Sequence, residues 1–187
     1  MFKKLNLFSK TEIKLLSFIS FQDRELYERE IAIGAKISVG SVNSILKKLS
    51  SLGLVIKSKK GKMLFYRRND SNPVLRQFKI FVNVSLLFPL VKKLVPISKR
   101  IVLFGSCAEG RNGETSDIDL FILTSEKDRV KKILRTYNEI QGIVMNSVEY
   151  SNLRDKDRVF YDNINKGIEL GDEIWMSDLG DVSKKGS

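Results

Sequence analysis

GSCAEGRNGETSDIDL, residues 105–120, is the most informative part of the sequence. It follows the apolar run Ile101–Phe104, which predicts a short buried strand. The run DIDLFIL, residues 117–123, predicts a second strand directly after the polar loop. Because successive side chains of a strand point to opposite faces, Asp117 and Asp119 should lie on the same face.

This pair of aspartates has two interpretations. Two carboxylates side by side repel each other, so the pair is tolerated where it is exposed or where a cation lies between its members. The first interpretation is an ordinary solvated turn. The second is a site for a hard divalent cation such as Mg²⁺, which takes oxygen ligands and shares them with substrate phosphates.

The residues before the aspartates favour the second interpretation. Gly105-Ser106 predicts a turn at which the backbone can come close to a ligand. Cys107–Gly110 predicts a short helix whose N-terminal amides point back at Ser106, an arrangement that binds anions. A calcium loop would instead carry its carboxylates within the loop and have helices on both sides.

Gly-Ser, a loop and Asp-x-Asp on the next strand resemble the nucleotidyltransferase motif of the DNA polymerase β superfamily in its minimal form. The features that coincide are the preceding strand, Gly105-Ser106, Gly110, Ser116 and Asp117-Ile118-Asp119. The resemblance covers about residues 95–175. It implies transfer of a nucleoside monophosphate from an NTP to an acceptor hydroxyl, with pyrophosphate as the leaving group.

The resemblance also implies which residues bind the nucleotide. Gly105 and Ser106 would hold the β- and γ-phosphates, and Ser116 would add a hydroxyl. Many relatives carry an arginine where this chain has Glu109, and Arg111 is the substitute that the sequence offers.

Three carboxylates are expected to form the catalytic metal site, with Mg²⁺ or Mn²⁺ as the cofactor. Asp117 and Asp119 would bind the metal ions that bridge the phosphates. The family normally has a third carboxylate on a neighbouring strand, which can accept the proton of the acceptor. The run GIVMNSVEY, residues 142–150, is interpreted as that strand, and Glu149 as that carboxylate. The alternative is a glutamate at the strand end that faces water.

Three helical patterns precede residue 53. Ser9 and Glu12 have the spacing of a capping box before the first pattern. Residues 27–35 predict a second, short helix, and Ser38 is a candidate N-cap of the third. The apolar stripe of the third helix consists of Val42, Ile45, Leu46, Leu49 and Leu52.

A hairpin follows these helices. Val55–Lys57 and Met63–Arg67 are β-prone runs on either side of a turn at Lys60-Gly61. Three short helices and a basic hairpin resemble a winged helix-turn-helix domain over about residues 9–68. Serine and asparagine can contact base edges, while lysines suit phosphates. The predicted DNA-binding residues are Ser41, Asn43, Ser44, Lys47 and Lys48 of the third helix, and Lys57, Lys59, Lys60 and Lys62 of the wing.

Charge and cysteine content narrow the function classes. The net charge is +11, and lysine and arginine predominate up to residue 100, whereas acidic residues slightly outnumber them afterwards. A basic N-terminal part points to a polyanion such as double-stranded DNA as its partner. The alternatives are a winged helix that docks a protein and lysines that only form a solvated surface. The single cysteine, Cys107, excludes an internal disulfide, so a reducing, cytoplasmic location is expected.

Residues 71–97 predict a connector made of one long helix and a short second one. Its apolar run, residues 80–91, is interrupted by polar residues and by Pro89, which should end or kink the helix near Phe88. The run is shorter than the ~20 residues that cross a membrane, so no membrane partner is expected. The excess of apolar residues has two explanations, a homodimer seam or packing against a core.

The expected fold class is α+β, with four segments. These are a winged helix-turn-helix domain (1–70), the helical connector (71–97), a nucleotidyltransferase domain with a mixed sheet (98–178), and a tail (179–187). Two functions remain open. One is a nucleotidyltransferase guided by a DNA-binding winged helix, whose acceptor includes a partner protein among the options. The other is a transcriptional regulator, or the antitoxin of a toxin–antitoxin pair, that binds nucleotide without turnover.

Overall fold

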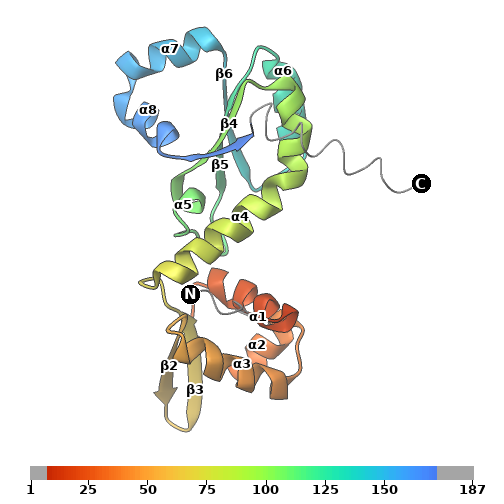
Figure 1. The fold of residues 1–187 in the computed structure, drawn as a ribbon, viewed down its shortest axis with the longest axis vertical. Coiled ribbons are helices and arrows are strands. Elements are labelled where there is room, and N and C mark those ends of the chain that lie inside the picture. The colour runs from red at the N-terminus through yellow and green to blue at the C-terminus, as the bar shows by residue number, and fades with distance from the viewer. Residues whose placement is uncertain (1–7, 172–187) are drawn as a thin grey trace, which may run out of the picture. The chain divides into compact units, whose positions relative to one another are not determined.

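The computed structural model describes residues 8–171 and divides the chain into two units (Figure 1). The first unit contains the chain up to Lys79 together with Asn112–Thr115, and the second contains Ile80–Arg111 and the chain from Ser116 onward. The predicted tail and residues 172–178 of the predicted nucleotidyltransferase domain lie outside the described residues.

The first unit consists of three helices and a three-stranded sheet. The helices are α1 (Lys10–Phe21), α2 (Glu28–Ala35) and α3 (Val39–Ser51), and the strands are β1 (Leu26–Tyr27), β2 (Val55–Lys60) and β3 (Met63–Arg68). The strand order is β1-β3-β2, and both pairings are antiparallel. This is the winged-helix arrangement that the sequence predicted, with the short strand β1 added.

Local sequence signals fix the ends of these elements. The capping box of Ser9 and Glu12 forms at the start of α1, and Ser38 accepts a hydrogen bond from the backbone of Ser41 at the start of α3. Lys60 pairs with Met63 across the hairpin, and Gly61 has a φ of 61° at its tip. A turn with positive φ favours glycine, which explains why the strands reverse at this position.

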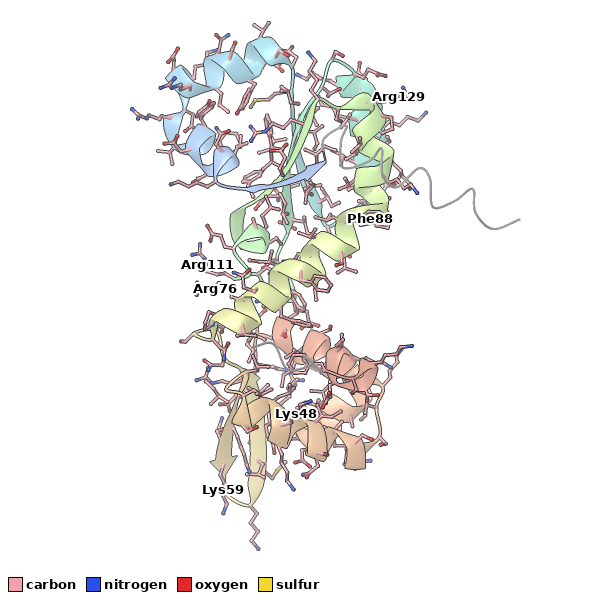
Figure 2. The ribbon with its side chains drawn as sticks, viewed as in Figure 1. Lys48, Lys59, Arg76, Phe88, Arg111 and Arg129 are labelled. Carbon is pink, nitrogen blue, oxygen red and sulfur yellow. The ribbon has the colours of Figure 1, made fainter. Side chains whose placement is uncertain are left out.

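Helix α4 (Pro73–Leu94) runs through Pro89 and is followed by a 3-10 turn, η1 (Val95–Ile97). The sequence predicted that the helix ends or kinks at this proline. The structure has the kink, since the ribbon of α4 changes direction near Phe88 (Figure 2). Proline cannot donate a backbone hydrogen bond. Burial of Leu87, Leu90 and Val91 around it keeps the helix continuous.

Helix α4 also has exposed apolar side chains. Phe81 is 67% exposed and Leu86 is 71% exposed. The stretch Pro73–Ile97 is long and apolar enough to cross a membrane by length and composition, with a mean hydropathy of 1.7, a test that core helices of soluble proteins also pass. Self-association through residues 71–97 stays a prediction.

The second unit is built around a four-stranded mixed sheet. Its strands are β4 (Arg100–Phe104), β5 (Ile118–Leu123), β6 (Ile140–Met145) and β7 (Ile168–Gly171), in the order β6-β5-β4-β7. Strand β4 is antiparallel to both β5 and β7, whereas β5 and β6 are parallel. The parallel pair needs a crossover, and α6 (Lys127–Leu134) provides it.

Helices cover both faces of this sheet (Figure 1). Leu103 and Leu120 point to the face covered by α4 and α6, and Val102 and Phe121 point to the opposite face. That second face is covered by α7 (Ser147–Lys156) and α8 (Arg158–Asn165). The strands are therefore apolar on both sides, which explains the continuous hydrophobic runs in the sequence. The α+β fold class is confirmed.

Candidate functional site

Gly105 and Asp119 touch at the centre of the candidate site. Phe104, the last residue of β4, pairs with Asp119 on β5, so the residue after it lies beside the aspartate. Gly105 begins the short helix α5 (Gly105–Ala108) with a φ of 68°. A Cβ atom at this position would lie 2.5 Å from Asp119 Oδ2. Only glycine satisfies both the dihedral angle and the close approach.

The two predicted metal-binding aspartates lie on either side of Ile118, the first residue of β5. Asp117 is exposed and precedes the strand, whereas Asp119 is half-buried within it. Burial and the nearby charge of Asp117 both raise the pKa of Asp119. The raised pKa means that the ionised pair is disfavoured in the protein alone, and a divalent cation would relieve this repulsion.

The loop between β4 and β5 is fixed by backbone hydrogen bonds. Arg111 N–H donates to the Ser106 carbonyl (2.9 Å), and Glu109 N–H donates to the Gly105 carbonyl (3.2 Å). Asn83 of α4 is buried and donates its side-chain amide to the Cys107 carbonyl (2.9 Å). These contacts hold the Gly-Ser turn in place next to Asp119.

A cavity of about 370 Å³ opens beside this turn, and we call it the motif cavity. It is lined by Phe104, Gly105, Ser106, Ala108, Glu109, Arg111, Asn163, Lys166 and Gly167. The predicted phosphate-binding residues Gly105, Ser106 and Arg111 thus share one cavity. Ser116 is half-buried immediately before Asp117 and is not part of its lining.

Sequence reasoning missed the wall that α8 contributes to the motif cavity. Ile168 on β7 pairs with Leu103 on β4, which brings the preceding Gly167 against the strand that leads to the Gly-Ser turn. A Cβ atom at Gly167 would lie 2.5 Å from the Leu103 carbonyl oxygen. Lys166 and Asn163 therefore reach the cavity through sheet pairing between segments far apart in the chain, for which no local signal exists.

Arg111 and Glu109 form an ion pair at the edge of the motif cavity. Both side chains are largely exposed (Figure 2 labels Arg111). The carboxylate partly neutralises the cation that the sequence offered as a phosphate ligand. Lys166 is consequently the other positive charge on the cavity wall, and it offsets the partial negative charge at the C-terminal end of α8.

A substitution of Lys166 tests this wall. We expect Lys166→Met to weaken binding of a nucleoside triphosphate roughly ten-fold, because a phosphate loses one charge-assisted contact worth about 1.5 kcal/mol. Binding of the corresponding nucleoside should not change. Lys156→Met, an exposed lysine of α7, is the matched control. Equal triphosphate affinity in the two variants would remove Lys166 from the site.

The strand predicted over residues 142–150 is right only as far as Met145, and the placement of Glu149 on it is wrong. Strand β6 ends at Met145, and α7 begins at Ser147 with Asn146 as its N-cap. Asn146 and Glu149 form a reciprocal capping box, with bonds of 2.9 Å and 2.8 Å. This local pairing satisfies two backbone N–H groups at the helix start, which a strand would leave to other partners.

Glu149 also binds a lysine instead of facing the aspartates. Lys127 Nζ lies 2.7 Å and 2.8 Å from its two carboxylate oxygens. The hydrogen bond from Lys127 and the backbone bond from Asn146 lower the pKa of Glu149. The glutamate is therefore part of a helix cap, and its prediction as a third metal ligand has no support from this geometry.

The residue that does face the pair from the next strand is Gln141. It pairs with Asp119 in the parallel register of β5 and β6. Its side-chain amide donates to Asp117 Oδ2 at 2.9 Å. Among the described residues, no group of three or more histidine, cysteine, aspartate or glutamate side chains could hold a metal ion. Asp117 and Asp119 fit a divalent cation that takes its remaining ligands from water or phosphate.

The predicted DNA-binding residues of α3 divide into two groups. Ser41, Ser44 and Lys47 are exposed. Asn43 instead donates to Glu28 (2.7 Å), and Lys48 pairs with Glu12 (2.8 Å). Figure 2 labels Lys48 on this helix.

Glu28 connects Asn43 to the sheet of the first unit. It accepts a hydrogen bond from the buried Tyr66 hydroxyl as well (3.1 Å). Burial and this glutamate raise the pKa of Tyr66 to about 12. Asn43 thus contributes to the packing of α2 and α3 against β3.

The wing carries the other predicted DNA contacts. Lys57, Lys59 and Lys62 are exposed on the hairpin of β2 and β3, where Figure 2 labels Lys59. Lys60 is also exposed and pairs with Glu25 at 2.5 Å, and this contact lowers the pKa of the glutamate. The hairpin therefore presents several positive charges that an anionic backbone could contact.

Comparisons with known proteins place a family match on the second unit. Residues 92–173 match the family model described as "Polymerase beta, Nucleotidyltransferase". No curated protein matches the chain.

Three solved structures are similar to parts of the chain. A proposed nucleotidyltransferase from Sulfolobus solfataricus is 20% identical, with 56% of this chain and 94% of that chain covered and a TM-score of 0.36. ZitR from Lactococcus lactis, in complex with DNA, is 20% identical, with 49% and 64% covered and a TM-score of 0.35. The adhesin competence repressor AdcR from Streptococcus pyogenes is 16% identical, with 48% and 69% covered and a TM-score of 0.37. Residues 92–173 therefore match the polymerase beta nucleotidyltransferase family, and the elements of the first unit have the winged-helix arrangement.

Proposed function

We propose that the second unit binds a nucleoside triphosphate with Mg²⁺ or Mn²⁺ and transfers its nucleoside monophosphate to an acceptor, while the first unit binds double-stranded DNA. The observation that carries this proposal is the contact between Gly105 and Asp119. The absent Cβ leaves the carboxylate beside a backbone turn that opens into the motif cavity. A phosphate in that cavity would therefore lie close to a metal-binding carboxylate.

The motif cavity suits phosphates in charge as well as in shape. Lys166 and Arg111 supply positive charge, and Ser106 supplies a hydroxyl. A divalent cation held by Asp117 and Asp119 would neutralise the triphosphate and stabilise charge on the entering and leaving oxygens. In the transfer, the oxygen of an acceptor hydroxyl would form a bond to the α-phosphorus and lose its proton to water, while the bond from the α-phosphorus to the oxygen it shares with the β-phosphate breaks and pyrophosphate leaves.

The proposal is tested in two stages. A fluorescent NTP analogue should bind the full chain in the presence of Mg²⁺ and bind much more weakly after chelation by EDTA. Incubation with α-labelled NTP and candidate acceptors, including duplex DNA, should then release pyrophosphate. Binding that is independent of the metal would contradict the proposed site.

A second candidate function is nucleotide-dependent regulation of DNA binding without turnover, as in a transcriptional regulator or an antitoxin with a protein partner. Gln141 favours it, because an amide cannot accept the proton of an acceptor hydroxyl. Metal-dependent NTP binding that changes the affinity for DNA, with no release of pyrophosphate, would support this function. Pyrophosphate release that needs an added acceptor would support transfer.

The salt dependence of DNA binding tests the role of the wing. Each lysine–phosphate pair that a substitution removes should lower the slope of log K against log salt concentration by about 0.9. We therefore expect replacement of Lys57, Lys59 and Lys62 by glutamine to lower the slope by about 2–3. Replacement of Lys131, Lys132 and Lys156 in the second unit removes the same charge and is the control. Equal slopes in the two triple variants would indicate that the wing does not contact DNA.

A further inference from the structure

Gln141 occupies the position from which a side chain on β6 meets the aspartate pair. The parallel register sets it directly opposite Asp119, and its amide reaches Asp117. Three adjacent side chains at the ends of two strands thus comprise two carboxylates and one neutral amide.

The amide presents its nitrogen to the carboxylate. Gln141 Nε2 lies 2.9 Å from Asp117 Oδ2, a normal distance for an N–H donor and an oxygen acceptor. The reverse orientation would place two acceptor oxygens against each other, which is repulsive. An amide nitrogen has no lone pair to offer a metal ion, and its N–H uses one of the sites at which Asp117 could bind one.

Within residues 8–171, no other acidic side chain takes over this position. Glu149 caps α7 and pairs with Lys127. Glu139 precedes β6 by one residue, and its side chain is exposed. The described residues contain no cluster of three metal-ligating side chains.

Charge then limits the number of metal ions. A pair of divalent cations needs carboxylate oxygens that bridge or flank both ions, as in the two-metal sites of nucleotide-processing enzymes. Two carboxylates and a neutral amide bring one negative charge less than three carboxylates do. The protein can therefore neutralise one divalent cation with its own side chains, and the triphosphate provides the remaining oxygens.

We infer that Gln141 restricts this site to a single divalent cation per bound nucleotide and leaves an acceptor hydroxyl without a protein carboxylate to take its proton. The inference rests on the proposed nucleotide site and adds its metal stoichiometry. With Gln141 at this position, the site can bind a nucleotide but has no carboxylate to support turnover. Introduction of a carboxylate at this position should complete a second metal site.

The test is a titration of Mn²⁺, followed by electron paramagnetic resonance, into the full chain saturated with a non-hydrolysable NTP analogue. We expect one bound Mn²⁺ per chain in the wild type and two in Gln141→Glu. Gln141→Asp tests the shorter side chain, and circular dichroism checks that both variants fold. Glu139→Gln, which changes the exposed carboxylate two residues before Gln141, is the matched control and should keep one bound ion.

Each outcome decides the matter. Two ions in the wild type would overturn the inference and leave the proposed nucleotide site intact. Loss of the ion in Glu139→Gln would also overturn it, because Glu139 would then be the third ligand. One ion in both folded Gln141 variants would show that this position does not set the stoichiometry. No nucleotide-dependent Mn²⁺ binding in the wild type would instead refute the proposed function itself.

Discussion

Gly105→Ala is expected to lower the affinity for metal–NTP roughly ten-fold or more and to lower the free energy of unfolding by about 1–3 kcal/mol. The stability loss comes from the φ of 68°, which a residue with a Cβ adopts only under strain. The affinity loss comes from the added methyl group, which would lie 2.5 Å from Asp119 Oδ2 and must displace that carboxylate. Thermal unfolding and titration with a fluorescent NTP analogue measure the two effects separately.

Gly61→Ala is the matched control for this substitution. Gly61 has a similar φ of 61°, but no atom lies within 4 Å of the Cβ that alanine would add. The two variants should therefore lose similar stability, and only Gly105→Ala should lose nucleotide affinity. Undiminished metal–NTP affinity in Gly105→Ala would mean that the position of Asp119 does not matter for binding.

Asp119→Asn is expected to stabilise the protein without ligand and to abolish its stabilisation by metal and NTP. Burial and the charge of Asp117 raise the pKa of Asp119, so the ionised carboxylate opposes folding near neutral pH. Asparagine removes that charge at nearly constant volume. It also removes a metal ligand, so the rise in melting temperature that Mg²⁺ and an NTP analogue cause in the wild type should disappear.

The pH dependence follows from the sign of this shift. A carboxyl whose pKa is raised on folding binds more protons in the folded state, so its contribution to stability falls as pH rises from the unfolded value toward the raised value. Below that range the carboxyl is protonated in the folded and unfolded states alike. Its titration should then cause no difference in stability between the wild type and Asp119→Asn. The advantage of the variant should appear as pH increases and then stay constant. Asp155→Asn, at an exposed position on α7, removes the same charge and is the control for the change in net charge.

The elements that sequence reasoning predicted well are those set by neighbouring residues. The caps at Ser9 and Ser38 and the hairpin turn at Gly61 depend on contacts over a few positions. The contact between Gly105 and Asp119 could also have been predicted from the sequence, because β4 and β5 follow one another in the chain and pair directly. Fold class and the centre of the site were therefore predictable.

The parts that sequence reasoning missed depend on pairing over long distances or on a competing local signal. Lys166 reaches the site only because β7 pairs with β4, a strand much earlier in the chain, and Gln141 reaches it because β6 pairs in parallel with β5 after the α6 crossover. Glu149 was assigned to a strand from its apolar neighbours. Asn146 and Glu149 have the spacing of a capping box, and this spacing would have placed Glu149 in the first turn of a helix.

Nuclear magnetic resonance of the ¹⁵N-labelled chain shows whether metal and nucleotide meet at the Gly105–Asp119 contact. Mn²⁺ added with a non-hydrolysable NTP analogue broadens the amide signals near the bound ion. We predict that the signals of Gly105, Ser106 and Asp119 broaden at a lower Mn²⁺ concentration than the other signals of the second unit. Broadening that spares Gly105 and Asp119 would show that the metal ion and the nucleotide do not bind at this contact.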